Sequence, residues 1–180
     1  MIMSDSYLDD ISDVYISEEQ IREKVKQLGE IISHDYKDKN LLIVGILKGC
    51  IVFLSDLIRE ITVPLTVDFM TVSSYKNSTS SCGNAEIISD LSRDIEGLDV
   101  LIVEDIIDSG ITLSELIPIL KKRNPASVKL CVLLDKPERR ETVINADYVG
   151  FEIENKFIVG YGLDYAEKYR NLKYIGIYNN

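Results

Sequence analysis

The sequence predicts a single α/β domain with a mostly parallel central sheet flanked by helices. Apolar runs such as 41–46 and 128–134 have the length of strands that are covered on both faces. Segments with helical spacing of apolar residues lie between such runs. Strands that alternate with helices imply right-handed crossovers, and such sheets bind ligands outside the carboxyl ends of their strands. At 180 residues and 46% hydrophobic content, the chain is expected to fold as one domain over 1–180.

The first helix is expected after a polar, acidic stretch, residues 1–14, which we interpret as a mobile arm. Ser17 and Gln20 have the spacing of a capping box, and apolar residues then recur at helical intervals until about Asp35. A second helix is expected over residues 51–60.

A third helix is expected after a buried strand at 99–104. Thr112 and Glu115 have the spacing of a capping box that would start this helix, and Pro118 inside it should bend it. The other expected strands are 65–73, 148–153, 157–159 and 174–178.

Residues 74–84 predict a long flexible loop. The segment has almost no apolar content and many turn-forming residues, so nothing in it can hold it against a core. Long loops inside small domains are often lids over active sites, and we expect that role here.

Composition excludes several classes of function. The net charge of −10 would repel a phosphate backbone, which argues against nucleic acid as a partner. No apolar run approaches the roughly 20 residues that cross a bilayer, so we expect no membrane partner and a cytoplasmic protein. Cys50, Cys82 and Cys131 are widely separated, which suggests neither a disulfide framework nor a thiolate metal site.

The chemistry is expected in the segment that follows the strand at 99–104. Glu104 and Asp105 are adjacent carboxylates at the strand's carboxyl end, and such a pair favours a divalent cation, a polyhydroxyl ligand or both. Residues 108–112 then supply small and hydroxyl side chains at the start of a helix, where free N–H groups favour phosphate. One loop that holds diols and phosphate describes a site for a ribose 5-phosphate.

This segment, residues 100–112, resembles the motif by which type I phosphoribosyltransferases bind 5-phosphoribosyl-1-pyrophosphate (PRPP). The motif is a run of apolar residues, two acids and then D-S/T-G-x-T. Other segments are similar to the hypoxanthine-guanine enzymes of this family, in the same order; these are residues 47–49, 74–75, 134–137 and 157–165. The resemblance implies the type I phosphoribosyltransferase fold, with a small hood built from the terminal segments and a mobile loop.

The same resemblance implies a purine salvage transferase that uses Mg²⁺. It would convert hypoxanthine or guanine and PRPP to IMP or GMP and pyrophosphate. Homodimers or homotetramers are usual among such enzymes.

Roles at the sugar and phosphates also follow from the resemblance. Glu104 and Asp105 would contact the ribose hydroxyls directly or through metal-bound water, and Asp164 would lie near a second metal and the base. Asp108 would be the general base that exchanges a proton with N7 of the purine, although an aspartate there can also cap the helix. The 5-phosphate would be held by Ser109, Gly110, Ile111 and Thr112.

Roles at the purine follow in the same way. Lys136 would donate a hydrogen bond to the 6-oxo group, since an ammonium group has only donors. Phe157 would stack on the purine, and the carbonyl of Ile158 would face its edge. The alternative readings are a solvated lysine at a strand end and a phenylalanine in the core.

The remaining roles concern pyrophosphate. Lys48 and Gly49 would form the pyrophosphate loop, in which the peptide between residues 47 and 48 can be cis, and Arg170 would hold pyrophosphate. Arg170 could otherwise lie on the solvated face of a short helix. The lid would include Ser74 and Tyr75.

Two rival interpretations remain open at this point. A signalling receiver domain also has an acidic pair, a further aspartate and a strand-end lysine, but its acidic pair follows an early strand. A regulator that senses PRPP without catalysis would keep the fold, and such proteins tend to carry a DNA-binding extension or a basic face, which this sequence does not show.

Overall fold

The computed structural model describes residues 8–74 and 85–179, which form two sheets and the helices around them. The main sheet has six strands in the order β4-β3-β2-β5-β6-β7, and only β4 is antiparallel to its neighbour. Its strands are β2 (Leu41–Leu47), β3 (Leu65–Ser74), β4 (Ala85–Ser89), β5 (Asp99–Ile107), β6 (Ser127–Asp135) and β7 (Tyr148–Glu152). The predicted mostly parallel sheet is therefore confirmed.

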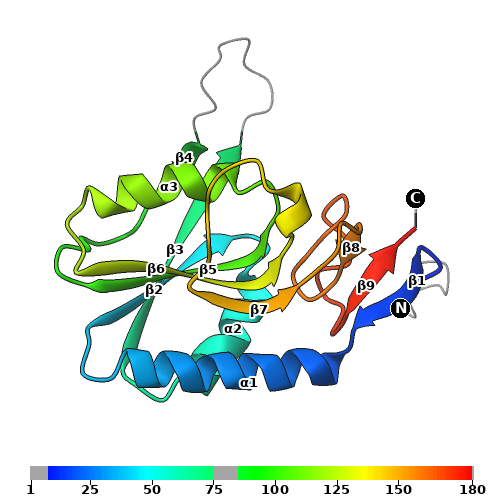
Figure 1. Cartoon of the computed structure of the whole chain (residues 1–180), viewed down its shortest axis with the longest axis horizontal. Helices are drawn as coiled ribbons and strands as arrows, with labels where there is room; N and C mark the ends of the chain where they lie inside the picture. The colour runs from blue at the N-terminus through cyan, green and yellow to red at the C-terminus, as the bar shows by residue number, and fades with distance from the viewer. Residues whose placement is uncertain (1–7, 75–84, 180) are drawn as a thin grey trace, which may run out of the picture.

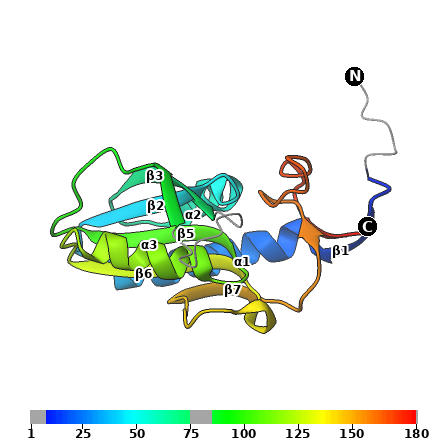
Figure 2. The same ribbon diagram turned by 90° about the horizontal axis from the view of Figure 1, so that it is seen from above.

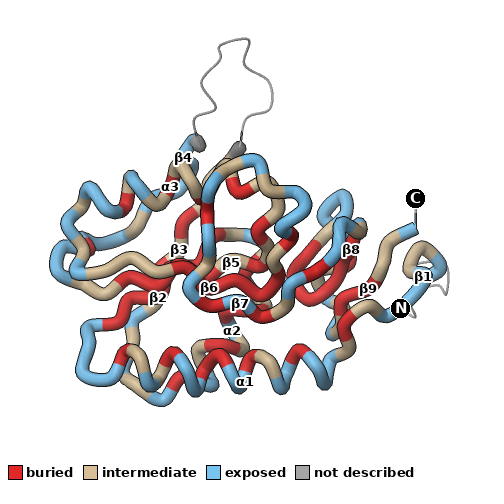
Figure 3. Tube along the Cα trace, in the orientation of Figure 1, coloured by how far each residue is buried: buried red, intermediate tan, exposed pale blue. Residues whose placement is uncertain are grey.

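Helices cover both faces of this sheet (Figure 1). The helical segments are α1 (Glu18–Asp35), α2 (Ile51–Glu60), α3 (Ile111–Lys121) and the short 3-10 helix η2 (Pro137–Arg139). Alternate residues of β5 point to opposite faces, so Leu101 packs with α1 and α2 while Ile102 packs with α3. Buried residues accordingly run along the central strands (Figure 3).

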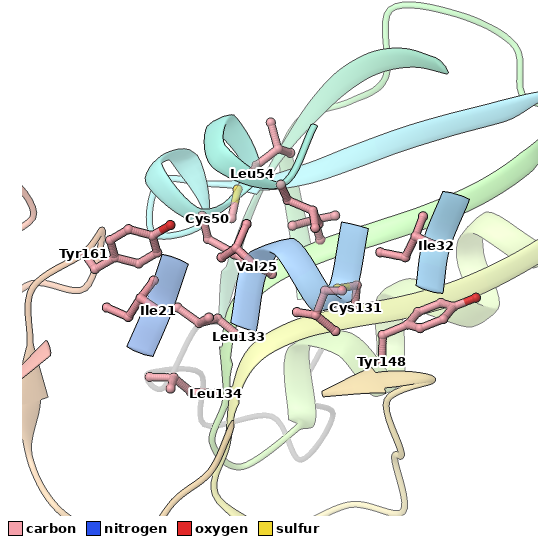
Figure 4. Packing of buried hydrophobic residues seen from close by; sticks show 14 of the residues in the cluster. Ile21, Val25, Ile32, Cys50, Leu54, Cys131, Leu133, Leu134, Tyr148 and Tyr161 are labelled. Atoms are coloured by element: carbon pink, nitrogen blue, oxygen red, sulfur yellow. The ribbon is translucent and has the colours of Figure 1, made fainter. Parts of the chain in front are cut away.

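Helix α1 forms as its sequence predicts. Ser17 Oγ accepts a hydrogen bond from Gln20 N at 3.2 Å, and Gln20 Oε1 accepts one from Ser17 N at 2.9 Å, so the capping box is complete. Ile21, Val25 and Ile32 of this helix are buried and gather around β6 and α2, as Figure 4 shows. Each such side chain contributes about 1.5–3 kcal/mol when it is fully buried.

A small second sheet is built from the two ends of the chain. Its order is β1-β9-β8, with strands β1 (Ile11–Ile16), β8 (Ile158–Val159) and β9 (Ile175–Tyr178). This sheet stands off from the main sheet in Figures 1 and 2. It matches the hood that we expected from the terminal segments.

The prediction of a mobile arm is wrong for residues 11–14, because they belong to β1. This strand pairs with β9 from the far end of the chain, for example Val14 with Gly176. A strand whose partner lies so far away in the sequence leaves little local signal. Residues 1–7 lie outside the described residues.

The region of the predicted loop is described only in part. Ser74 ends β3, and residues 75–84 lie outside the described residues, so the flexible loop stays a prediction. Strand β4, which follows them, was not predicted.

Helix α3 begins differently from the prediction. It starts at Ile111, and its N-cap is Gly110 with φ 79°, without a side-chain cap, so the predicted capping box of Thr112 and Glu115 is wrong. A Cβ atom at Gly110 would lie 2.6 Å from Ile144 Cγ2, so the tight packing and the left-handed backbone both require glycine. Pro118 lies inside the helix, as expected. No helix among the described residues combines the length and the apolar character needed to span a membrane.

Candidate active site

Several of the predicted site residues lie side by side at the carboxyl ends of β5 and β6. The two strands pair in parallel up to Ile107 and Asp135, and Lys136 N donates a hydrogen bond to Ile107 O at 3.0 Å. The acidic pair, the loop at 108–112 and Lys136 therefore share one edge of the sheet. Residues 153–157 connect β7 to β8 of the small sheet, and Lys156 in this segment accepts a hydrogen bond from Lys136 at the same edge.

Asp105 lies buried at this edge, and Glu104 beside it is partly buried. Burial, and then the charge of Asp105, raises the pKa of Glu104 well above its usual range. Glu104 Oε2 is buried and has no hydrogen-bond partner among the described residues. Burial also raises the pKa of Asp105 to about 6. Hydrogen bonds to its carboxylate, such as that from Ile106 N at 2.9 Å, lower this pKa and offset part of the effect of burial. A buried acid without a partner is costly, so the pair is suited to a cationic or hydroxyl-bearing ligand.

The loop after β2 packs directly against this acidic pair. A Cβ atom at Gly49 would lie 1.8 Å from Asp105 Oδ2, so only glycine allows the backbone this close to the carboxylate. A Cβ atom at Gly162 would in turn lie 2.2 Å from Gly49 O. The peptide bond between Leu47 and Lys48 is cis, as the resemblance implied.

The donor set fits a magnesium ion that also binds oxygen atoms of a ligand. No group of three or more His, Cys, Asp and Glu side chains among the described residues could hold a metal by itself. Mg²⁺ is usually bound by one or two carboxylates together with substrate phosphates. Glu104 and Asp105 offer two carboxylates, whereas Asp164 is paired with Arg170 at 2.8 Å and accepts a hydrogen bond from Glu167 N.

The loop at 108–112 forms one wall of a cavity of about 250 Å³. The cavity is lined by Glu104, Ile106, Ile107, Asp108, Ser109, Gly110, Thr112 and Leu113. The start of α3 faces it, and the free N–H groups of a helix start favour an anion. A larger cavity, of about 400 Å³, lies between α1, α2 and residues 170–173, and Arg170 is its single predicted site residue.

Asp108 does not cap α3, since Gly110 occupies the cap position. Its Oδ1 instead accepts a hydrogen bond from Arg139 Nε at 3.2 Å, and both side chains are about half exposed. The carboxylate is therefore held by a cation at the mouth of the cavity and remains accessible to a ligand.

Lys136 is buried rather than solvated, with only 7% of its surface exposed. Its Nζ donates a hydrogen bond to the carbonyl oxygen of Lys156 at 2.7 Å. Burial lowers the pKa of Lys136, and the negative charge of Asp108 opposes that effect. The ammonium group thus points to the backbone immediately before Phe157 and keeps further N–H donors for a ligand.

Phe157 is not a core residue, since 50% of its surface is exposed. Its ring meets Tyr165 edge to face, with ring centres 5.6 Å apart, and it also contacts Tyr178. Ile158 is buried in β8. An exposed aromatic ring, one residue after the carbonyl group that binds the Lys136 ammonium group, suits the recognition of a flat polar heterocycle.

Arg170 is largely buried, so the reading of a solvated helix face is wrong. Besides its ion pair with Asp164, it donates a hydrogen bond to Gly162 O at 2.7 Å. Residues 166–170 form turns in which Ala166, Glu167 and Tyr169 have positive φ. Glu167 also pairs with Lys48 at 3.1 Å, which links this turn to the loop after β2.

Sequence reasoning missed two arginines of the site, Arg139 and Arg140. Both contact Asp108, the first at its carboxylate and the second at its carbonyl oxygen. Two adjacent cations just after a strand end, in a strongly acidic chain, were the available signal.

Comparisons with known proteins identify the family of the chain. Residues 15–166 match the phosphoribosyl transferase domain family. The chain is 54% identical to the hypoxanthine-guanine phosphoribosyltransferase of Bacillus subtilis over 168 residues, which cover 93% of each chain. It is also 54% identical to the bifunctional protein TilS/HprT of Listeria innocua, but it spans only 27% of that longer protein.

Among solved structures, the chain is similar to a hypoxanthine phosphoribosyltransferase from Staphylococcus aureus. The TM-score is 0.93 and the identity is 47%, with 98% of this chain and 96% of the other covered. The fold, the site and these similarities agree, and the chain therefore belongs to the phosphoribosyl transferase family, among the hypoxanthine-guanine phosphoribosyltransferases.

Proposed function

We propose that this chain transfers the 5-phosphoribosyl group of PRPP to hypoxanthine or guanine, which yields IMP or GMP and pyrophosphate in purine salvage. One observation carries the proposal. The acidic pair of Glu104 and Asp105, with a buried and unpartnered Glu104 oxygen, continues directly into the loop at 108–112, which we call the anion cradle, and the buried Lys136 lies at the same edge of the sheet. The similarity to the Bacillus subtilis hypoxanthine-guanine phosphoribosyltransferase and the Staphylococcus aureus hypoxanthine phosphoribosyltransferase supports it.

The sugar phosphate fits the cavity at 108–112. The N–H groups and hydroxyls from Ser109 to Thr112 would hold the 5-phosphate at the start of α3. Glu104 and Asp105 would accept hydrogen bonds from the ribose hydroxyls, which would give the unpartnered Glu104 oxygen a donor.

The purine would lie between the ends of β6 and β8. Lys136 would donate to O6 of hypoxanthine or guanine, while the amino group of adenine offers the ammonium group no acceptor at that position. Phe157 would stack on the ring, and the carbonyl of Ile158 would face the base edge.

In the proposed reaction, N9 of the purine forms a bond to C1 of the ribose as the bond from C1 to pyrophosphate breaks. The electron pair of the breaking bond leaves with pyrophosphate, and Asp108 accepts the proton from N7. General base catalysis of this kind contributes about 10²–10⁴-fold. Lys48, Gly49 and Arg170 would hold pyrophosphate, and Ser74 and Tyr75 would belong to the lid.

We also propose Mg²⁺ as the cofactor. Glu104 and Asp105 would hold it together with oxygen atoms of PRPP, and Asp164 would serve a second metal position. The metal would neutralise charge on the leaving pyrophosphate.

The partners would be small molecules, without nucleic acid or membrane. A cytoplasmic location is proposed because Cys50 and Cys131 are buried free thiols, which is typical of reducing compartments. The resemblance also favours homodimers or homotetramers, and light scattering coupled to gel filtration measures which of these forms.

Steady-state assays test the function. The purified chain is incubated with PRPP and Mg²⁺ and with hypoxanthine, guanine, xanthine or adenine, and nucleotide formation is followed. Turnover of hypoxanthine or guanine, its loss on chelation of the metal and rejection of adenine are expected. Calorimetry with PRPP and Mg²⁺ completes the test: binding without turnover would identify a PRPP-sensing regulator, and absence of binding would refute the proposal altogether.

A further inference from the structure

Arg140 joins two parts of the site that belong to different strands. Its NH2 group pairs with the carboxylate of Asp135, at the end of β6, and its NH1 group donates a hydrogen bond to the carbonyl oxygen of Asp108 at 3.2 Å. The Arg140 and Asp135 side chains are only 16% and 19% exposed, so water weakens this pair much less than it weakens a surface pair.

The two residues after Arg140 also contact the loop at 108–112. Glu141 N donates a hydrogen bond to Ser109 O at 2.9 Å, and the Thr142 hydroxyl lies 3.4 Å from the same oxygen. A Cβ atom at Gly110 would lie 2.8 Å from Thr142 Oγ1 and 3.2 Å from Arg140 Cδ. The anion cradle, residues 108–112, therefore packs tightly against residues 140–142.

We propose that Arg140 is a positioning residue that fixes Asp108 relative to Lys136. This inference rests on the proposed function. O6 and N7 are neighbouring atoms on one edge of a 6-oxopurine, so the group that donates to O6 and the group that takes the proton from N7 must keep a fixed separation. Arg140 can fix this separation because it binds Asp108 at one side and Asp135 at the other, and Asp135 directly precedes Lys136 in the chain.

The geometry requires a guanidinium group at this position. Arginine presents several N–H groups in a rigid planar fork, so one side chain can bind a carboxylate and a carbonyl oxygen together. A lysine ammonium group is a compact charge on a flexible stem and would favour the Asp135 carboxylate. Loss of the second contact would free the Asp108 peptide while the ion pair remained.

Kinetics of Arg140→Ala test the inference. A misplacement of about 1 Å can cost on the order of 10²-fold in rate, so we expect kcat for hypoxanthine to fall by roughly 10-fold to 100-fold. We expect Arg140→Lys to have an intermediate rate. Millimolar guanidinium chloride should restore part of the activity of Arg140→Ala, because the free ion can occupy the vacated site, and a general loss of structure would not respond in this way.

Arg123→Ala provides the matched control. Arg123 also forms a two-contact ion pair, with Asp90 at 2.8 Å for both contacts, but it lies just beyond the opposite end of α3 from the cradle. Its removal should leave kcat within about twofold of the unaltered enzyme, with no response to guanidinium. Retention of full activity by Arg140→Ala, or loss of activity without guanidinium rescue in a folded variant, would overturn the proposal. If Arg140→Ala does not fold, Arg140→Lys decides, and an unchanged kcat there overturns it too.

Amide hydrogen exchange separates this inference from the proposed function. Exchange at residues 108–112 should be faster in Arg140→Ala than in the unaltered chain, whereas exchange along β2 should be unchanged. This readout needs no catalysis. Absence of turnover in the unaltered chain would thus refute the transferase proposal, while equal exchange at 108–112 would refute the role of Arg140.

Discussion

Replacing Asp105 with asparagine should stabilise the ligand-free protein, although it alters a residue of the proposed ribose site. Burial raises the pKa of this carboxyl group from the ordinary 3.8 to about 6. Ionised Asp105 also raises the pKa of its neighbour Glu104. Asparagine keeps an oxygen that can accept the hydrogen bond from Ile106 N, but it cannot ionise.

The magnitude follows from linkage between protonation and folding. Between pH 4 and 6 the folded protein holds the Asp105 proton more tightly than the unfolded chain, so the free energy of unfolding falls as pH rises through this window. A pKa that is raised from 3.8 to about 6 corresponds to about 3 kcal/mol of stability, which is lost in full above pH 7. Asp105→Asn should therefore be more stable than the unaltered protein by up to about 3 kcal/mol at pH 8, and by much less at about pH 4.

Urea unfolding of both proteins without metal or nucleotide, at about pH 4 and pH 8, measures this difference. The comparison between the two pH values cancels the packing change that the amide introduces. Asp68→Asn is the control, because Asp68 is equally buried, at 9% exposure, yet its pKa is lowered. Burial alone would raise that pKa, but hydrogen bonds from Phe69 and Ser92 outweigh burial, so Asp68→Asn should lose stability at pH 8. A gain for Asp105→Asn that is equal at both pH values would refute the reasoning.

Three further substitutions test the proposed chemistry. Asp108→Asn should lower kcat by about 10²–10⁴-fold and change the affinity for PRPP, measured by calorimetry, far less. An equal fold-loss in kcat and in PRPP affinity would contradict the role of Asp108 as a base. Lys136→Ala should reduce the preference for hypoxanthine over adenine, measured as the ratio of their kcat/KM values; an unchanged ratio would remove Lys136 from base recognition. Gly49→Ala should raise KM for PRPP, because the added Cβ would lie 1.8 Å from Asp105 Oδ2, and an unchanged KM would show that the loop can shift without loss.

Local signals in the sequence were sufficient for much of the fold. The capping box of Ser17 and Gln20 and the apolar spacing after it located α1, because both act within a few helical turns. The buried run at 99–104 located β5, and the acids that follow it located the site, because the carboxyl end of a parallel strand is where such a fold binds ligands.

Other features depended on contacts between distant parts of the chain, and only the tertiary structure decided them. Strand β1 exists because β9, from the far end of the chain, pairs with it. Gly110 rather than Thr112 is the N-cap of α3, and Arg140, Thr142 and Ile144 pack closely against it. Lys136 can be buried because its ammonium group donates a hydrogen bond to the backbone carbonyl oxygen of Lys156, which is distant in the sequence. The sequence alone determined which chemical groups the site contains, whereas their separations were decided by which strands the folded sheet made neighbours.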